Sequence, residues 1–187
     1  MRVRKLEESD VGDAVRILVL SFERELNFIF KDIELARELF FKFFSDYNEN
    51  CFVVEEERVL GFASYSVRKM PISKLLRKEL GFVNGFKASL LISYLCPKPK
   101  RKEGVINFIA VSPLRRNRGA GSLLLSKIIE DARDKGVRRL KSYVSLENDA
   151  GIGLLTKFGF EIDKMLDNSF AEKNFGQRQW YLMKLEL

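Results

Sequence analysis

The chain has 187 residues and a formal net charge of +7, with 46% hydrophobic and 32% charged residues. This balance is typical of a globular protein, and the length is most simply accommodated in one domain spanning residues 1–187. Histidine is absent and the two cysteines, Cys51 and Cys96, lie far apart, which excludes Ser-His-Asp and Cys-His catalysis and an ordinary structural zinc site. The positive net charge is compatible with an anionic ligand, with nucleic acid or with an acidic membrane surface, and it does not distinguish among these three partners.

The N-terminal region predicts an edge strand followed by two helices. We expect the strand at residues 3–6, a first helix after the acidic capping residues 7–10, and a second helix over about 33–47. Between the helices lies an aromatic-rich connection that contains Phe22, Leu26, Phe28 and Phe30. No signal-peptide core and no apolar run long enough to span a bilayer occur, so the protein is expected to be soluble and cytoplasmic.

The next region predicts two strands and an unusual helical segment. The strands are expected at 51–54 and 59–67, joined by a charged turn. Residues 68–103 contain two apolar helical stretches separated by glycines, and they end in the basic linker 97–102, which cannot continue a helix. We expect this segment to be a substrate lid or a homodimer surface, in preference to an amphipathic element that lies on anionic lipid.

Residues 105–136 predict a buried strand, a basic glycine loop and a helix in succession. Residues 105–111 form a nearly continuous apolar and β-branched run, which is typical of a strand buried on both faces. The loop that follows contains three arginines and two glycines and leads into an amphipathic helix. A helix N-terminus after a glycine loop offers convergent N–H groups to an anion such as phosphate. Neither the P-loop fingerprint nor the dinucleotide-binding fingerprint is present.

The C-terminal third predicts a parallel strand–helix–strand unit and a terminal hairpin. Gly136 suits the end of the crossover helix, and residues 139–146 read as the second parallel strand. A further strand begins near residue 160. Residues 180–187 alternate between apolar and polar side chains, which indicates a terminal antiparallel strand.

Two motifs in this half resemble those of the GNAT superfamily, the acyl-CoA-dependent N-acyltransferases. Residues 116–121 read R-N-R-G-A-G and satisfy the family pattern [Q/R]-x-x-G-x-[G/A], after a strand that ends in A-V-x-P. Residues 148–160 resemble the second family signature, N-x-x-A-x-x-(L/F)-Y-x-K-x-G-F. The positions that match this signature are Asn148, Leu154, Lys157, Gly159 and Phe160. Two ordered motifs at the family's usual separation are far more specific than either alone.

The resemblance implies an α/β fold with a mixed, mostly antiparallel central sheet, a splayed parallel strand pair and flanking helices. Typical family members pass from the third strand to the fourth in a short turn, so we expect residues 68–103 to be a helical insertion before the fourth main strand. The resemblance also implies that acetyl-CoA is the acyl donor, with its pantetheine arm between the splayed strands and its pyrophosphate on the glycine loop. No metal site is implied. The residues implied in cofactor binding are Ile109, Ala110, Val111, Arg116, Asn117, Arg118, Gly119, Ala120, Gly121, Ser122 and Asn148.

The activity implied is direct transfer of an acetyl group to a primary amine on a small molecule or a protein. The sequence departs from the family at the catalytic positions. Leu155 stands where the family's tyrosine protonates the leaving thiolate, and Tyr143 stands where some members carry a glutamate base; Asn107 is not a base. We take Tyr143 as the candidate catalytic residue, although a strand tyrosine that simply packs in the core is an equally good interpretation. Thr156 or water could also replace the missing acid.

Two other functions stay open on the sequence. The missing tyrosine is consistent with a catalytically weak acyl-CoA-binding regulatory module. Nucleic-acid binding ranks lower, because the basic residues lie in a phosphate loop and a linker without the interleaved aromatic residues of single-strand binders. The sequence does not identify the acceptor amine.

Overall fold

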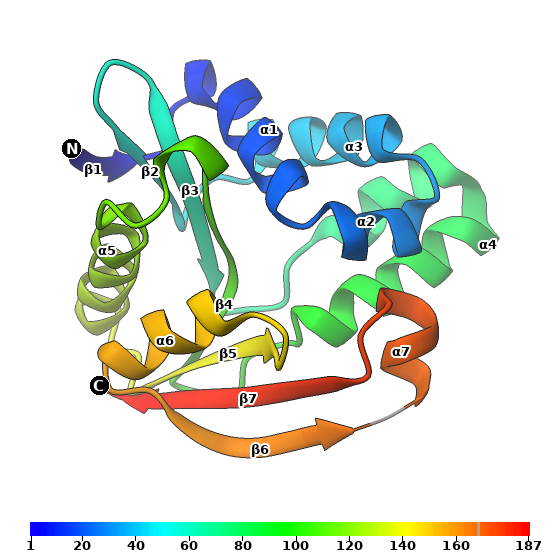
Figure 1. The fold of residues 1–187 in the computed structure, drawn as a ribbon. Coiled ribbons are helices and arrows are strands. Elements are labelled where there is room, and N and C mark those ends of the chain that lie inside the picture. The colour runs from blue at the N-terminus through cyan, green and yellow to red at the C-terminus, as the bar shows by residue number, and fades with distance from the viewer. Residues whose placement is uncertain (168) are drawn as a thin grey trace.

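A seven-stranded sheet forms the centre of the chain, with the strand order β1-β2-β3-β4-β5-β7-β6 (Figure 1). The structure is a computed structural model that describes residues 1–167 and 169–187. The strands are β1 Arg2–Lys5, β2 Cys51–Glu55, β3 Val59–Ser66, β4 Glu103–Val111, β5 Arg139–Ser145, β6 Glu161–Asp167 and β7 Gln179–Glu186. The helices are α1 Val11–Ser21, α2 Glu23–Phe30, α3 Ile33–Asp46, α4 Ile72–Leu95, α5 Ala120–Asp134, α6 Asp149–Lys157 and α7 Ser169–Phe175.

The strand pair β4–β5 is parallel, and the other neighbouring strands are antiparallel. Residues 103–106 of β4 pair with 139–142 of β5, and the pairing ends there, although both strands continue. Beyond that point β4 stays with β3 and β5 stays with β7, so the two central strands diverge. Asn107 is an extra residue in β4, since Ser64 pairs with Phe108 and the next residue of β3 pairs with Ile106. The expected mixed sheet with a splayed parallel pair is confirmed.

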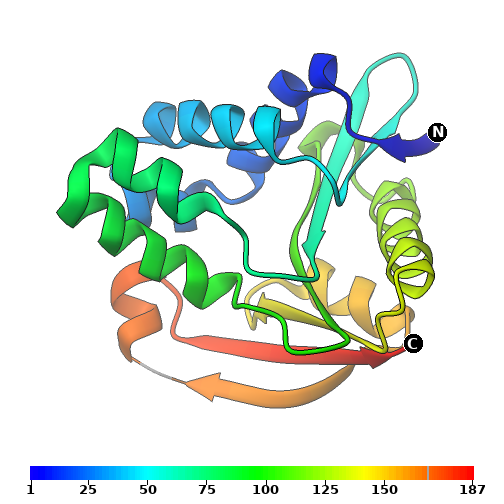
Figure 2. The same cartoon turned by 180° about the vertical axis from the view of Figure 1, so that it is seen from behind.

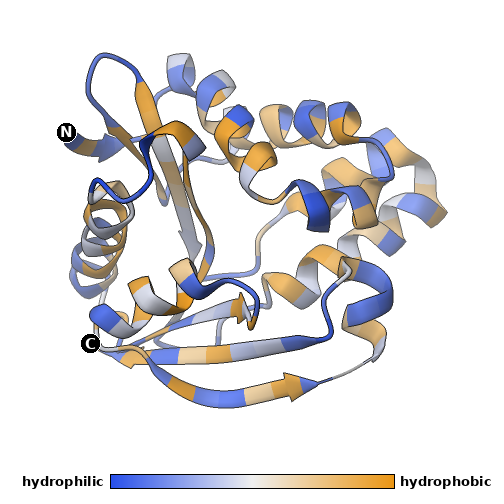
Figure 3. Cartoon of the chain, viewed as in Figure 1, coloured by the Kyte–Doolittle hydropathy of each residue, from blue (hydrophilic) through white to orange (hydrophobic). Residues whose placement is uncertain are grey.

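Apolar side chains bury both faces of the sheet. On one face α1 and α3 pack on β3 and β4, with the Phe44 ring edge-on to the Phe62 ring at 5.0 Å between centroids. On the other face α5 packs on β2 to β4 through the fully buried Leu124 and Leu125. Each helix in Figure 3 carries both apolar and polar residues, the pattern of a helix that buries one face. The crossover helix α5 and the parallel pair confirm the predicted strand–helix–strand unit.

Most predicted elements are present, but two were missed. Residues 22–30, expected as a connection, contain helix α2, whose Leu26 and Phe30 are four residues apart and both buried. Helix α7 was not anticipated; its Ala171 and Phe175 are completely buried. Both helices are short, so their apolar periodicity was too brief to distinguish a helix from an irregular segment.

The expected helical insertion is present as α4, whose two halves meet at a kink at Gly81 (Figure 2). A Cβ added at Gly85 would lie 2.5 Å from Arg77 Cα, so the second half packs directly against the first only because residue 85 is glycine. The buried side of α4 packs against α3 and, through Leu91, against α7. Its exposed apolar residues are Phe82, Val83, Phe86 and Leu90.

Both cysteines are buried and unbridged, as expected for small apolar side chains. Burial raises the pKa of the Cys51 thiol and of the Cys96 thiol to about 12. Within the described ranges, no helix is long and apolar enough to cross a membrane.

A partly buried ion-pair network joins β1, β2 and the turn before α1. The Arg4 guanidinium donates to Asp10 Oδ1 at 2.9 Å and to Glu55 Oε2 at 2.6 Å, while the Glu7 N–H donates to Asp10 Oδ2 at 2.9 Å. Asp10 is only 6% exposed. The hydrogen bond from Arg4 outweighs burial and holds the pKa of the Asp10 carboxyl below its usual value of 3.8.

We predict that Asp10→Asn lowers the free energy of unfolding by about 1–3 kcal/mol at pH 7, because a charge-assisted bond to a buried group is lost. A depressed carboxyl pKa stabilises the fold above the unfolded-state pKa, and this contribution is lost as the pH falls through the folded-state pKa. Urea denaturation at pH 7 and pH 3 measures the difference in the free energy of unfolding between the wild type and the variant. This difference should be smaller at pH 3. The control Asp13→Asn removes an exposed pair with Arg16 and should change stability by less than about 0.5 kcal/mol.

Candidate active site

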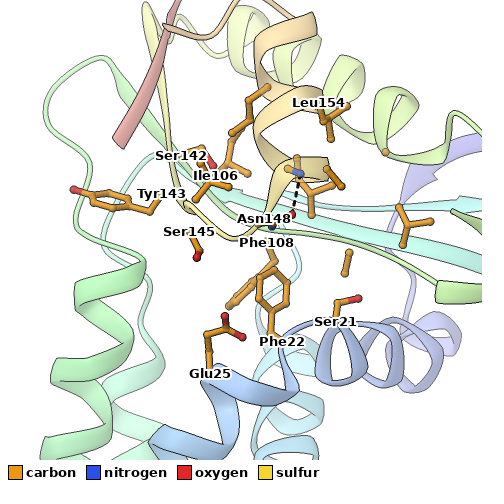
Figure 4. Close-up of a pocket in the computed structure, with 18 of the residues that line it drawn as sticks. Ser21, Phe22, Glu25, Ile106, Phe108, Ser142, Tyr143, Ser145, Asn148 and Leu154 are labelled. Atoms are coloured by element: carbon orange, nitrogen blue, oxygen red, sulfur yellow. Dashed lines mark hydrogen bonds between the residues drawn. The ribbon is translucent and has the colours of Figure 1, made fainter. Parts of the chain in front are cut away.

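A cavity of about 860 Å³ lies where β4 and β5 separate (Figure 4). Its size is in the range of small-molecule binding sites. Its walls come from residues 106–111 of β4, residues 142–145 of β5, the glycine loop, and the N-terminal turns of α5 and α6. The far wall is made by residues 20–25 of α1 and α2 and by two side chains near the start of β7, Gln177 and Trp180.

The glycine loop forms one end of the cavity and meets the geometric requirements of a phosphate site. Gly119 has φ of 86° and precedes the first turn of α5, which has no side-chain cap. The first N–H groups of a helix have no partner within it, so those of residues 120–122 are available to an anion. Asn117 is also left-handed, with φ of 61°. Among the described residues, the side chains of Arg115, Arg116 and Arg118 take part in no ion pair.

The structure gathers ten of the eleven residues implied in cofactor binding around this one cavity. The exception is Arg118, which lies in the same loop but does not line the cavity. Asn148 is the N-cap of α6, and its Oδ1 accepts the Gly151 N–H at 2.9 Å. Its Nδ2 has no partner among the described residues. One end of this side chain is therefore engaged by the protein, and the other is free to donate to a ligand.

The catalytic candidates occupy different positions. Leu155, at the position of the family's tyrosine, lines the cavity and is 4% exposed. Tyr143 also lines it, but Figure 4 shows its ring pointing away from Asn148 and Leu154. The ring packs with the apolar cluster of α4 and α7, and burial raises the pKa of its phenol. Thr156 was wrongly included as a substitute acid, because it is exposed and lies outside the cavity lining.

The expected lid is not observed. None of the residues described within 68–103 lines the cavity, because α4 packs against α3 and α7 instead. A homodimer surface on this segment stays a prediction.

Glu25 on α2 is the principal site residue that the sequence analysis missed. It is partly buried in the cavity wall, and its Oε1 accepts a hydrogen bond from Gln177 Nε2 at 2.9 Å. Burial raises the pKa of the Glu25 carboxyl above its usual value. The positive charge of Arg24 lowers this pKa by a smaller amount, and the negative charge of Glu147 raises it slightly. The four-residue spacing of Leu26 and Phe30 was the one sequence signal for α2, and it is too short by itself to establish a helix or the placement of Glu25.

Two buried polar atoms of the cavity wall lack partners among the described residues. They are Gln177 Oε1 and Ser21 Oγ. Gln177 is 8% exposed, and Trp180 Nε1 donates to its backbone carbonyl at 3.0 Å, which helps to hold this part of the wall. A buried polar atom without a partner is costly, so these two atoms carry a desolvation cost in this wall.

Solved structures with similar folds are acetyltransferases. Ribosomal-protein-alanine N-acetyltransferase from Brucella melitensis has a TM-score of 0.69 and 22% identity, with all of both chains covered. Ard1 from Thermoplasma volcanium has a TM-score of 0.63 and 20% identity, with 100% of this chain and 97% of that chain covered. A putative acetyltransferase from Salmonella typhimurium, solved with its cofactor acetyl-CoA, has a TM-score of 0.64 and 17% identity, with 100% and 94% covered. At these identities the likeness establishes the fold.

Sequence comparison points to the same family. An uncharacterized N-acetyltransferase of Methanocaldococcus jannaschii is 39% identical over 62 residues, which are 33% of this chain and 27% of that protein. The match thus spans about a quarter of the curated relative. The profile of the acetyltransferase (GNAT) family matches residues 16–160, which include both predicted motifs and the whole diverging strand pair. The chain therefore belongs to the GNAT acetyltransferase family.

Proposed function

We propose that this protein transfers an acetyl group from acetyl-CoA to the nitrogen of a primary amine. The single observation that carries the proposal is the continuous cavity between β4 and β5, with a phosphate-type loop at one end and the partly buried Glu25 carboxylate at the other. A long anionic thioester and an amine that approach from opposite ends would meet between the strands. Holding both reactants in this geometry is itself a large part of catalysis.

The chain's own groups fit acetyl-CoA. The free N–H groups at the start of α5 and the Arg116 guanidinium would bind the pyrophosphate, since both offer positive charge to phosphate oxygens. Beyond Ile106 the edge of β4 that faces β5 has no strand partner, so residues 109–111 can pair with the amides of the pantetheine arm. Asn148 Nδ2 would donate to the same arm.

Tyr143 is the proposed donor of a proton to the leaving thiolate, in place of the tyrosine that Leu155 replaces. Because burial raises the pKa of its phenol, the group stays protonated at neutral pH and is able to act as an acid. Approach to the thiolate requires the ring to turn from the cluster of α4 and α7, or a water to bridge the gap.

Titration calorimetry with acetyl-CoA tests the binding half of the proposal, and thiol release in the presence of primary amines tests transfer. We expect saturable binding and amine-dependent release of coenzyme A. Binding without release for any amine would favour the regulatory module, for which Leu155 is the specific observation. Absence of binding at millimolar acetyl-CoA would contradict both functions.

We predict that Gly119→Ala weakens acetyl-CoA binding about tenfold. An alanine at φ of 86° is strained by about 1–2 kcal/mol, and relief of that strain turns the loop N–H groups away from the phosphates. Calorimetry measures the change. Gly136→Ala is the matched control, because Gly136 has φ of 71° at the other end of α5 and does not line the cavity. It should lose similar stability and keep its affinity; equal affinities for both variants would contradict the assignment.

We predict that Tyr143→Phe lowers kcat about 10²-fold and leaves acetyl-CoA affinity unchanged, because general acid help is lost while the ring is kept. Steady-state kinetics with the best amine, together with calorimetry, measure the two quantities. An unchanged kcat would mean that Tyr143 serves only to pack against α4 and α7.

A further inference from the structure

The acceptor end of the cavity contains a set of polar groups that nothing else in the fold requires. Glu25 from α2 and Gln177 from the loop before β7 meet there through a 2.9 Å hydrogen bond. Residues 25 and 177 are far apart in sequence, so tertiary packing alone brings them together. In Figure 4 the Glu25 carboxylate lies beside the Phe22 and Phe108 rings and points toward the end of β5 that carries Ser145.

The orientation of the Gln177 amide follows from this bond. A carboxylate only accepts hydrogen bonds, so the NH₂ group of Gln177 must face Glu25, and Oε1 must face the other way. Gln177 Oε1 is buried and has no partner within the described part of the chain. Gln177 therefore orients the Glu25 carboxylate in the cavity wall through its NH₂ group. The carboxylate accepts hydrogen bonds, which matches a ligand that donates them.

We propose that Glu25 is the general base that takes a proton from a cationic primary amine, and that Gln177 is the positioning residue that orients the Glu25 carboxylate. The inference rests on the proposed acetyl transfer. An ammonium group has three donors and no acceptor, so one of its N–H groups bonds the Glu25 carboxylate. The Phe22 ring, edge-on to Phe108 at 5.5 Å between centroids, gives the carbon atoms next to the nitrogen an apolar wall.

The reaction balances with these groups. Glu25 accepts one proton from the ammonium, directly or through one water, and the freed nitrogen lone pair forms a bond to the thioester carbonyl carbon. The C–S bond then breaks, and the coenzyme A thiolate leaves as the amide forms. The second proton that the nitrogen gives up goes to the thiolate, with Tyr143 or water as the carrier. Glu25 releases its proton to solvent, so the products are the amide, the thiol and one proton.

The charges around Glu25 suit this role. Burial disfavours the ionised carboxylate and is the largest influence on Glu25, so the pKa of this carboxyl is raised. The Arg24 guanidinium, which binds Glu147 Oε2 at 2.6 Å and the Gly176 carbonyl, lowers this pKa by less than burial raises it, and Glu147 raises it slightly further. A carboxylate with a raised pKa is a stronger base at neutral pH than an exposed one. The same negative charges attract a cationic acceptor.

Kinetics of Glu25→Gln test the base. The wild type is first assayed for thiol release with acetyl-CoA and three probes: spermidine, a peptide with a free N-terminus, and a peptide with an internal lysine. We expect Glu25→Gln to lower kcat about 10²–10⁴-fold for the amine that works best, and to abolish the acidic limb of the kcat/KM profile against pH. Acetyl-CoA affinity should stay within about twofold, since Glu25 is at the opposite end of the cavity from the loop.

Three further variants separate catalysis from structure. Glu25→Asp keeps a base and should recover part of the activity. Gln177→Leu should lower kcat about tenfold and move the acidic limb of the kcat/KM profile to higher pH, because it removes the hydrogen bond that orients and stabilises the Glu25 carboxylate. Glu38→Gln, an exposed change on α3, should leave every parameter unchanged. Because burial raises the pKa of Glu25, its ionised form opposes folding above that pKa, and Glu25→Gln should not lower the melting temperature at neutral pH.

The outcomes distinguish the two proposals. A wild type that acetylates no probe contradicts the proposed function, and the inference falls with it. A wild type that works, with Glu25→Gln within threefold in kcat and with the same acidic limb, overturns the assignment of Glu25 and leaves acetyl transfer intact. An unchanged kcat and an unshifted acidic limb in Gln177→Leu overturn the positioning role.

Discussion

The divergence of β4 and β5 is the constraint on which the rest of the site depends. Parallel hydrogen bonds join these strands only from Glu103 to Ile106, and each strand then follows its antiparallel neighbour. The extra residue Asn107 in β4 coincides with the point of separation. A gap between two strands of one sheet leaves backbone groups without partners in a buried setting, which is costly unless a ligand satisfies them. The sheet itself therefore builds the cavity.

The elements around the gap supply charge of opposite sign at its two ends. The arginine loop and the uncapped N-terminus of α5 provide positive potential at one end. At the other end, Glu25 and Glu147 provide negative charge beside apolar rings. A polarised cavity of this kind suits an anionic donor and a cationic acceptor that enter from opposite sides.

Sequence patterns predicted the cofactor side of the molecule more completely than the acceptor side. Residues 105–136 form one local unit, in which strand, loop and helix follow each other without interruption, so the local pattern predicted the structure and an anion-binding loop, and the family resemblance implied the cofactor. The proposed acceptor side joins Glu25, Gln177 and Tyr143, which come from three separate regions of the chain. Thr156 shows the limit of motif matching: it is adjacent to Leu155, yet the turn of α6 directs it to solvent. Neighbours in sequence need not share a site.

The sequence by itself determined the family, the order of the sheet's central elements and the phosphate-type loop, because each depends on residues close together in the chain. Only the tertiary structure decided that α2 places a carboxylate in the cavity wall, that Gln177 donates a hydrogen bond to this carboxylate, and that α4 packs away from the cavity. The physical reason is that burial and long-range hydrogen bonds depend on packing between distant segments. A sequence pattern can predict a helix from its periodicity, but it does not show which residues the polar side chains of that helix contact.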